Sequence, residues 1–142
     1  MKTYVLDASV ILKWLFPDNE DEQDVENALW LLDLVKNKQC ELYEPVHWLA
    51  EVGAVATRLA PDYSAEAISF LYAMQLNTLN DLGIYELASH LSGKYEHHMF
   101  DTLYHSVALC AKDAELITAD EKYFKKTNGE GRIKLLKDIS IT

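Results

Sequence analysis

Long apolar segments are absent from this sequence, and their absence limits where the protein can work. No stretch approaches the roughly 20 uninterrupted apolar residues that a membrane-spanning helix needs. The apolar N-terminus is broken by Asp7 and Lys13, which is unlike a signal peptide. We therefore expect a soluble protein of the cytoplasm that has no membrane partner.

Cysteine and several familiar motifs are also scarce or missing. Only Cys40 and Cys110 occur, far apart and in apolar surroundings, which excludes a disulfide framework and a CxxC metal knuckle. We expect both to be reduced core residues. The sequence contains no HExxH zinc motif, no GxxxxGKS phosphate loop and no GxGxxG fingerprint. Zinc chemistry and nucleotide binding are thus disfavoured.

Basic residues are outnumbered, with 13 Lys and Arg against 23 Asp and Glu, which gives a formal net charge of -10. Nucleic-acid binding proteins usually carry clustered positive charge, so this balance argues against such a partner. The C-terminal part differs, because from Lys112 onward it has seven basic and six acidic residues. Both a basic binding track and an ordinary solvated surface fit this segment.

The order of the apolar segments predicts an α/β fold. A length of 142 residues with 49% hydrophobic content fits one domain over residues 1–142. Apolar runs that end at turn residues predict strands over residues 3–6, 41–44, 114–119 and 133–136. Helical spacing predicts helices over 9–16, 28–35 after an acidic run at 18–26, 46–59, 64–76, 84–95, 100–111 and 122–126. This alternation implies a mainly parallel central sheet of about 4–5 strands with helices on both faces.

Two aspartates come directly after predicted strands. Asp7 ends the first strand, and Asp120 follows the strand that ends at Ala119. In open parallel sheets, ligands gather outside the carboxyl ends of the strands, so both side chains are expected at the same edge. The simpler alternative is that each aspartate only caps the helix that follows it.

Two further acids lie on predicted helices among apolar neighbours. Glu51 shares an apolar stripe of its helix, which predicts a buried carboxylate that needs a cation, a basic partner or hydrogen bonds. Arg58, one turn further along, is the alternative partner. Asp101 lies in a similar apolar setting, where it alternatively supplies only favourable charge in the first helical turn.

Taken together, Asp7, Glu51, Asp101 and Asp120 predict one site for a divalent metal ion. Several carboxylates within a few Å repel one another unless a cation neutralises them, and all-oxygen ligands favour Mg²⁺ or Mn²⁺. None of the five histidines has a convergent set of partners, so none is expected to be a ligand. Such an ion activates water and stabilises the charge that builds on a phosphodiester, which makes phosphodiester hydrolysis the predicted chemistry.

The sequence also resembles a known family in the order and spacing of its segments. These are YVLDASVILKWLFP, EPVHWLAEVGAVATR, FDTLYHSVALCAKDAELITAD and a following KYF, which resemble the PIN domain of VapC-type toxins of toxin-antitoxin systems. By this resemblance the four acids would bind metal, and the hydroxyls of Ser9 and Thr118 would help to order the site. It further implies a ribonuclease dependent on Mg²⁺ or Mn²⁺, a homodimer, and a small cognate antitoxin protein that blocks the site.

Two other functions fit parts of the pattern. A PIN-like module that has lost catalysis would act by binding protein or RNA, although all four acids are intact. A phosphotransfer receiver domain also places acids at strand ends, but it needs paired acids after the first strand, where Asp7 stands alone. The leading prediction is a metal-dependent endoribonuclease in which Glu51 or an aspartate orients or deprotonates the attacking water.

Overall fold

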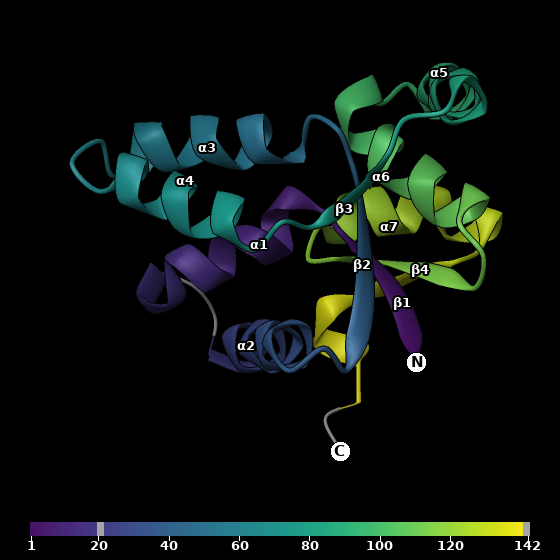
Figure 1. The fold of residues 1–142 in the computed structure, drawn as a ribbon. Coiled ribbons are helices and arrows are strands. Elements are labelled where there is room, and N and C mark those ends of the chain that lie inside the picture. The colour runs from purple at the N-terminus through teal and green to yellow at the C-terminus, as the bar shows by residue number, and fades with distance from the viewer. Residues whose placement is uncertain (20–21, 141–142) are drawn as a thin grey trace.

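A parallel sheet lies at the centre of the computed structural model, which describes residues 1–19 and 22–140 (Figure 1). Its strands are β1 (Lys2–Leu6), β2 (Cys40–Pro45), β3 (Asn77–Leu79), β4 (Ala114–Thr118) and β5 (Ile133–Leu135). They are ordered β3-β2-β1-β4-β5, and every neighbouring pair is parallel. The predicted α/β class is therefore confirmed, with five strands and an entirely parallel sheet.

The two central strands are buried on both faces. In β1, the side chains from Thr3 to Leu6 are all buried, and in β4 only Glu115 is partly exposed. Strands covered on both faces read as nearly continuous apolar runs, which is why the sequence located these two reliably. Leu6 and Ile117 stand side by side in register, so the two strands end close together at one edge of the sheet.

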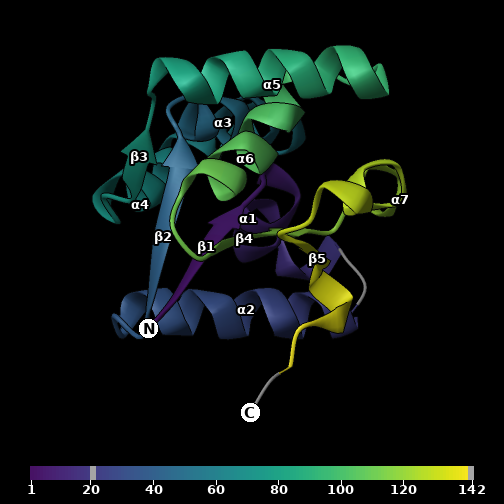
Figure 2. The same cartoon turned by 90° about the vertical axis from the view of Figure 1, so that its right-hand side faces the viewer.

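Helices cover the sheet in layers. In the described residues they are α1 (Ala8–Leu15), α2 (Glu22–Lys36), α3 (Trp48–Leu59), α4 (Ser64–Ala73), α5 (Leu82–Tyr95), α6 (Met99–Cys110) and α7 (Glu121–Thr127), with short 3-10 turns at Pro17–Asn19, Asn128–Glu130 and Leu136–Asp138. Figure 2 shows α6, backed by α5, on one face of the sheet and α2 on the other, where α1 packs beside it. Helices α3 and α4 form an antiparallel pair that extends to one side (Figure 1).

The sequence missed β3. We expected a helix to continue to residue 76, but α4 ends at Ala73, and Gln75 has a φ of 49°, which does not continue a helix. The strand that follows has three residues that are all at least partly exposed, so it shows no apolar pattern. It forms because its backbone pairs with β2, a tertiary contact that local sequence does not signal.

Two smaller expectations concern the cysteines and the acidic run. Cys40 is buried as predicted, but Cys110 is exposed, so its assignment to the core was wrong. The acidic run predicted before the second helix includes residues 20–21, which lie outside the described residues. Within residues 1–19 and 22–140, no helix combines the length and apolar character needed to cross a membrane.

The strand order reverses between β1 and β4. From β1 the chain adds β2 and then β3 on one side, and it returns to place β4 and β5 on the other. At such a switch point the connections leave the sheet in opposite directions, and the space outside the carboxyl ends of the two strands is where ligands bind in open α/β folds.

Candidate active site

Asp7 and Asp120 lie at this switch point and cap the helices that follow. The Asp7 Oδ1 accepts a hydrogen bond from the backbone N–H of Ser9 at 3.1 Å, at the start of α1. The Asp120 Oδ1 accepts one from the Tyr123 N–H at 3.0 Å, at the start of α7. Both aspartates therefore cap helices, and each cap fixes a carboxylate at the same sheet edge.

Two hydroxyl groups hold these aspartates in place. The Ser9 hydroxyl donates to Asp7 Oδ1 and accepts from the backbone N–H of Ala119 at 3.0 Å. The buried Thr118 hydroxyl accepts from the backbone N–H of Asp120 at 3.0 Å. Both residues selected by resemblance therefore contact the backbone or side chain of a site aspartate.

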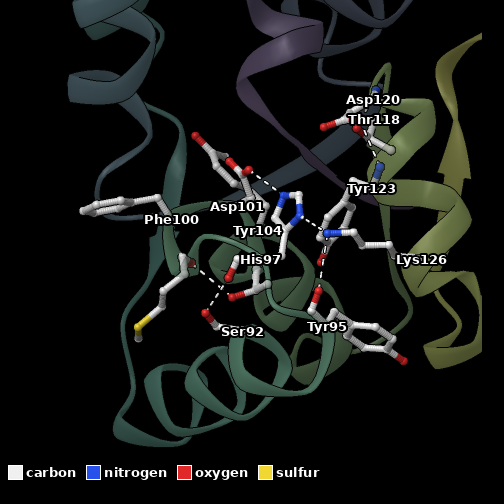
Figure 3. A network of polar contacts seen from close by, with 12 residues as sticks. Ser92, Tyr95, His97, Phe100, Asp101, Tyr104, Thr118, Asp120, Tyr123 and Lys126 are labelled. Atoms are coloured by element: carbon white, nitrogen blue, oxygen red, sulfur yellow. Dashed lines mark hydrogen bonds and ion pairs between the residues drawn. The ribbon is translucent and has the colours of Figure 1, made fainter.

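Asp101 reaches the site from the first turn of α6. Its Oδ2 lies 2.8 Å from Nε2 of His97, just ahead of that helix, and the ring of His97 lies between Asp101 and Lys126 (Figure 3). The Lys126 ammonium donates to His97 Nδ1 at 3.2 Å. Since an ammonium has no lone pair, Nδ1 is the acceptor, so the neutral ring carries its proton on Nε2 and donates to Asp101. Sequence reasoning did not connect His97 with Asp101, because their contact crosses the break between two helices.

Glu51, on α3, is held from two sides. The Tyr104 hydroxyl donates to Glu51 Oε1 at 3.1 Å, and His47 Nε2 lies 3.6 Å from Oε2. The side chain is 25% exposed, so the prediction of a buried carboxylate was wrong. Its partners are these two rings rather than Arg58, which lies in the last turn of the same helix.

Glu44, near the end of β2, is fully buried. The backbone N–H of Leu6 donates to Glu44 Oε1 at 3.1 Å, and Oε2 has no hydrogen-bond partner in the part of the chain that the structure describes. Burial raises the pKa of Glu44 well above its usual value, and the negative charge of Asp7 raises it further. Glu44 was not predicted from the sequence, although it alternates with Cys40 and Leu42, which are the buried apolar side chains of the same strand.

The acids around Asp7 repel it electrostatically. Burial raises the pKa of Asp7 from 3.8 to about 6, and the charges of Asp101 and Asp120 raise it too, against hydrogen bonds from Ser9 and Thr118 that lower it. The pKa of Tyr104 is likewise raised, first by burial and then by Glu44, Glu51 and Asp7. Asp101 and Asp120 therefore act on Asp7, and Asp7 acts on Glu44, while the charge of Glu51 reaches the same group of residues through Tyr104.

The chemistry of this cluster suits a hard divalent cation. All of its ligand candidates are carboxylate oxygens, and Asp101 and Asp120 each use one oxygen in the contacts above. Among residues 1–19 and 22–140, however, no three His, Cys, Asp or Glu side chains are arranged so that they could hold an ion. The negative charge of the cluster and its carboxylate oxygens suit a divalent metal ion. In this structure, however, Asp101 and Glu51 accept hydrogen bonds from His97 and Tyr104.

Comparison with known proteins gives one family. The family model for the PIN domain matches residues 4–130, a span that includes every acid of the cluster. No curated protein matches the chain.

Proposed function

Since this chain belongs to the PIN domain family, we propose that it is an endoribonuclease that depends on Mg²⁺ or Mn²⁺. Membership of the family implies a nuclease-type function in general. The observation that best supports the narrower proposal is the state of Asp7. Its pKa is raised to about 6 by burial and by Asp101 and Asp120, and such a cluster is stabilised when a cation neutralises it.

In this proposal, Asp7, Glu51, Asp101 and Asp120 would hold the metal. When bound, the ion would supply Lewis-acid stabilisation of the negative charge that develops on the phosphodiester. Ser9 and Thr118 keep the two strand-end aspartates at the edge of the sheet. Glu51 or one of the aspartates orients the attacking water or takes its proton.

Two residues that were not predicted from the sequence, Tyr104 and His97, form hydrogen bonds with the acids. The buried Tyr104 donates to Glu51, and its raised pKa keeps this phenol protonated and able to donate at any physiological pH. His97 donates to Asp101. These contacts limit how far the carboxylates can move, and partners of this kind orient ligands in metal sites.

The proposal is tested by incubating purified protein with mixed single-stranded RNA, with and without Mg²⁺ or Mn²⁺. Wild type is expected to cleave only with metal, and Asp7→Asn and Asp101→Asn are expected to lose on the order of 100-fold in rate. Asp113→Asn is the matched control, because Asp113 is exposed and precedes β4, at the opposite edge of the sheet. It should cleave as wild type does.

Two results would contradict catalysis. One is a wild type that is inactive with every metal tested, and the other is cleavage by the Asp7 and Asp101 variants that is as fast as cleavage by Asp113→Asn. In the first case, retained RNA binding would support the alternative of a PIN-like module without catalysis.

We further infer from the resemblance that the protein is the toxin of a two-gene system of the cytoplasm, acting as a homodimer and blocked by a small antitoxin. Induced expression of wild type should then stop growth of a bacterial host, whereas Asp7→Asn should not. A small protein encoded immediately upstream should restore growth and bind the purified toxin. The mass of the toxin in solution should be that of two chains.

A further inference from the structure

A surface pocket of about 570 Å³ opens beside the acidic cluster, at the junction of α5, α6 and α7. Its lining includes Glu96, His97, His98, Lys122 and Lys126. Lys122 and Lys126 come from α7, whereas the other three come from the connection between α5 and α6. The pocket therefore forms where two segments that each carry a site aspartate come together.

His97 connects this pocket directly to the cluster. Its ring lines the pocket, its Nε2 donates to Asp101, and its edge packs on Tyr123 with ring centroids 4.8 Å apart. Figure 3 shows Lys126 on the other side of the same ring. A group bound at Lys126 would therefore lie one side chain away from a carboxylate of the proposed metal site.

The two lysines of the pocket differ from other lysines of the chain. Lys94 and Lys137 form ion pairs with Glu130 and Glu121, at 2.7 and 2.5 Å. For Lys122 and Lys126, no ion pair with a carboxylate is found within residues 1–19 and 22–140. Their positive charge is therefore not neutralised by a described acid in contact with them.

The contacts of Lys126 also leave it able to bind an anion. An ammonium has three N–H donors, of which two point to the Tyr95 carbonyl oxygen, at 3.3 Å, and to His97 Nδ1. These contacts hold the side chain in the lining of the pocket without cancelling its charge. Glu96 contributes one negative charge, so two cations and one anion line the space.

We propose that this pocket binds a backbone phosphate of the RNA strand next to the phosphodiester that is cut, with Lys122 and Lys126 as the cationic contacts. This proposal depends on the proposed function, because it supplies the substrate contact that the nuclease needs. A strongly acidic protein repels RNA unless cations lie where the strand crosses it. The pocket places two such cations beside the cluster, where an RNA approaching the acids would pass.

The test measures RNA binding in the absence of divalent metal, so that cleavage plays no part. A fluorescein-labelled single-stranded RNA is titrated with protein in EDTA at several salt concentrations, and binding is followed by fluorescence anisotropy. Each lost phosphate contact should reduce the slope of log K against log salt by about 0.7. We expect this reduction, with weaker binding at every salt concentration, for Lys122→Gln and Lys126→Gln.

Lys125→Gln is the matched control. Lys125 is an exposed lysine of the same helix that does not line the pocket, so the change in net charge is identical. Its slope should equal that of wild type. Lys126→Arg, which keeps the charge, should also retain the wild-type slope. Equal thermal midpoints for the variants would exclude misfolding as the cause of weaker binding.

The proposal is overturned if wild type shows no salt-dependent RNA binding, or if Lys125→Gln lowers the slope as much as the two pocket variants do. This failure is distinct from failure of the nuclease proposal. A protein that cleaves RNA but whose pocket variants keep the wild-type slope refutes the pocket alone. One that binds with the expected slopes but never cleaves refutes only catalysis.

Discussion

The hydroxyl of Ser9 accepts a hydrogen bond from the backbone N–H of Ala119 at 3.0 Å, across 110 positions of sequence. Ser9 follows β1, and Ala119 follows β4. The same hydroxyl donates to the carboxylate of Asp7. One side chain thus joins the carboxyl ends of the two central strands and fixes the aspartate that lies between them.

Ser9→Ala should therefore affect both stability and the charge of Asp7. The partly buried N–H of Ala119 would lose its acceptor, which should lower the free energy of unfolding by about 1–2 kcal/mol. The pKa of Asp7 should rise above its value of about 6, because the Ser9 hydrogen bond lowers it. Denaturant unfolding and NMR titration of the Asp7 carboxyl measure the two effects. Ser9→Thr, which keeps the hydroxyl, is the control, and a Ser9→Ala protein with unchanged Asp7 titration would contradict this role.

Glu44 should make stability depend on pH. In the folded protein, the Glu44 carboxyl keeps its proton at pH values where the same carboxyl in the unfolded chain, with a pKa near 4.5, has released it. The folded state then binds more protons than the unfolded state, so stability falls as pH rises above 4.5, by at most about 1.4 kcal/mol per pH unit. In Glu44→Gln this loss is absent. The variant should therefore gain stability relative to wild type as pH increases from 4.5 to 8.

The difference in unfolding free energy between Glu44→Gln and wild type, measured by urea unfolding across that range, checks the prediction. At pH 4 the variant should be no more stable than wild type, because the buried amide brings two donors where the protonated acid has one. Glu41→Gln is the matched control, since Glu41 is an exposed acid of the same strand. A difference that stays constant with pH would show that Glu44 is ionised in the folded protein.

Local pattern in the sequence was enough to predict every strand of the sheet except β3, and the edge where the strand-end aspartates lie. Strands β1 and β4 were found because they are continuously apolar, and Asp7 and Asp120 followed from the ends of these strands. Burial was harder to predict. Glu51 was expected to be buried because its helix is apolar around it, but the neighbouring Tyr104 and His47 hold it in a partly exposed position.

The parts that the sequence did not reveal depend on contacts between distant segments. Glu44 is buried because it lies on the same face of β2 as the buried Cys40 and Leu42, whereas Glu41 is exposed on the other face. His97 meets Lys126 only because α7 packs against the connection before α6, 29 positions later in the chain. Tertiary packing decides such neighbours, and a single sequence contains no direct signal of it.

Metal binding should stabilise the folded protein through Asp101. An ion that binds only the folded state raises the thermal midpoint, by an amount that grows with its concentration relative to Kd. Mn²⁺ should therefore raise the midpoint of wild type and of Asp113→Asn equally, and that of Asp101→Asn much less. Differential scanning fluorimetry at fixed pH measures these midpoints. Equal shifts for all three proteins would remove Asp101 from the site.

His97 should act on metal binding through Asp101 rather than on the fold. In His97→Phe the aromatic ring and its packing on Tyr123 are kept, while the hydrogen bonds to Asp101 and Lys126 are lost. Partners that orient metal ligands typically contribute 10- to 100-fold to metal affinity or activity. We expect the Mn²⁺ concentration that gives half-maximal cleavage to rise by roughly tenfold or more. The free energy of unfolding without metal should change by less than about 1 kcal/mol, because the ring still fills its space.

His90→Phe is the matched control, since His90 is exposed on α5 and receives the same substitution. Its metal dependence should equal that of wild type. A purely structural role for His97 predicts the opposite result, in which the variant loses stability but cleaves with an unchanged metal requirement. Measuring the metal requirement and the stability separately distinguishes the two roles. The hydrogen bond from His97 affects the proposed metal only through the Asp101 carboxylate that it orients.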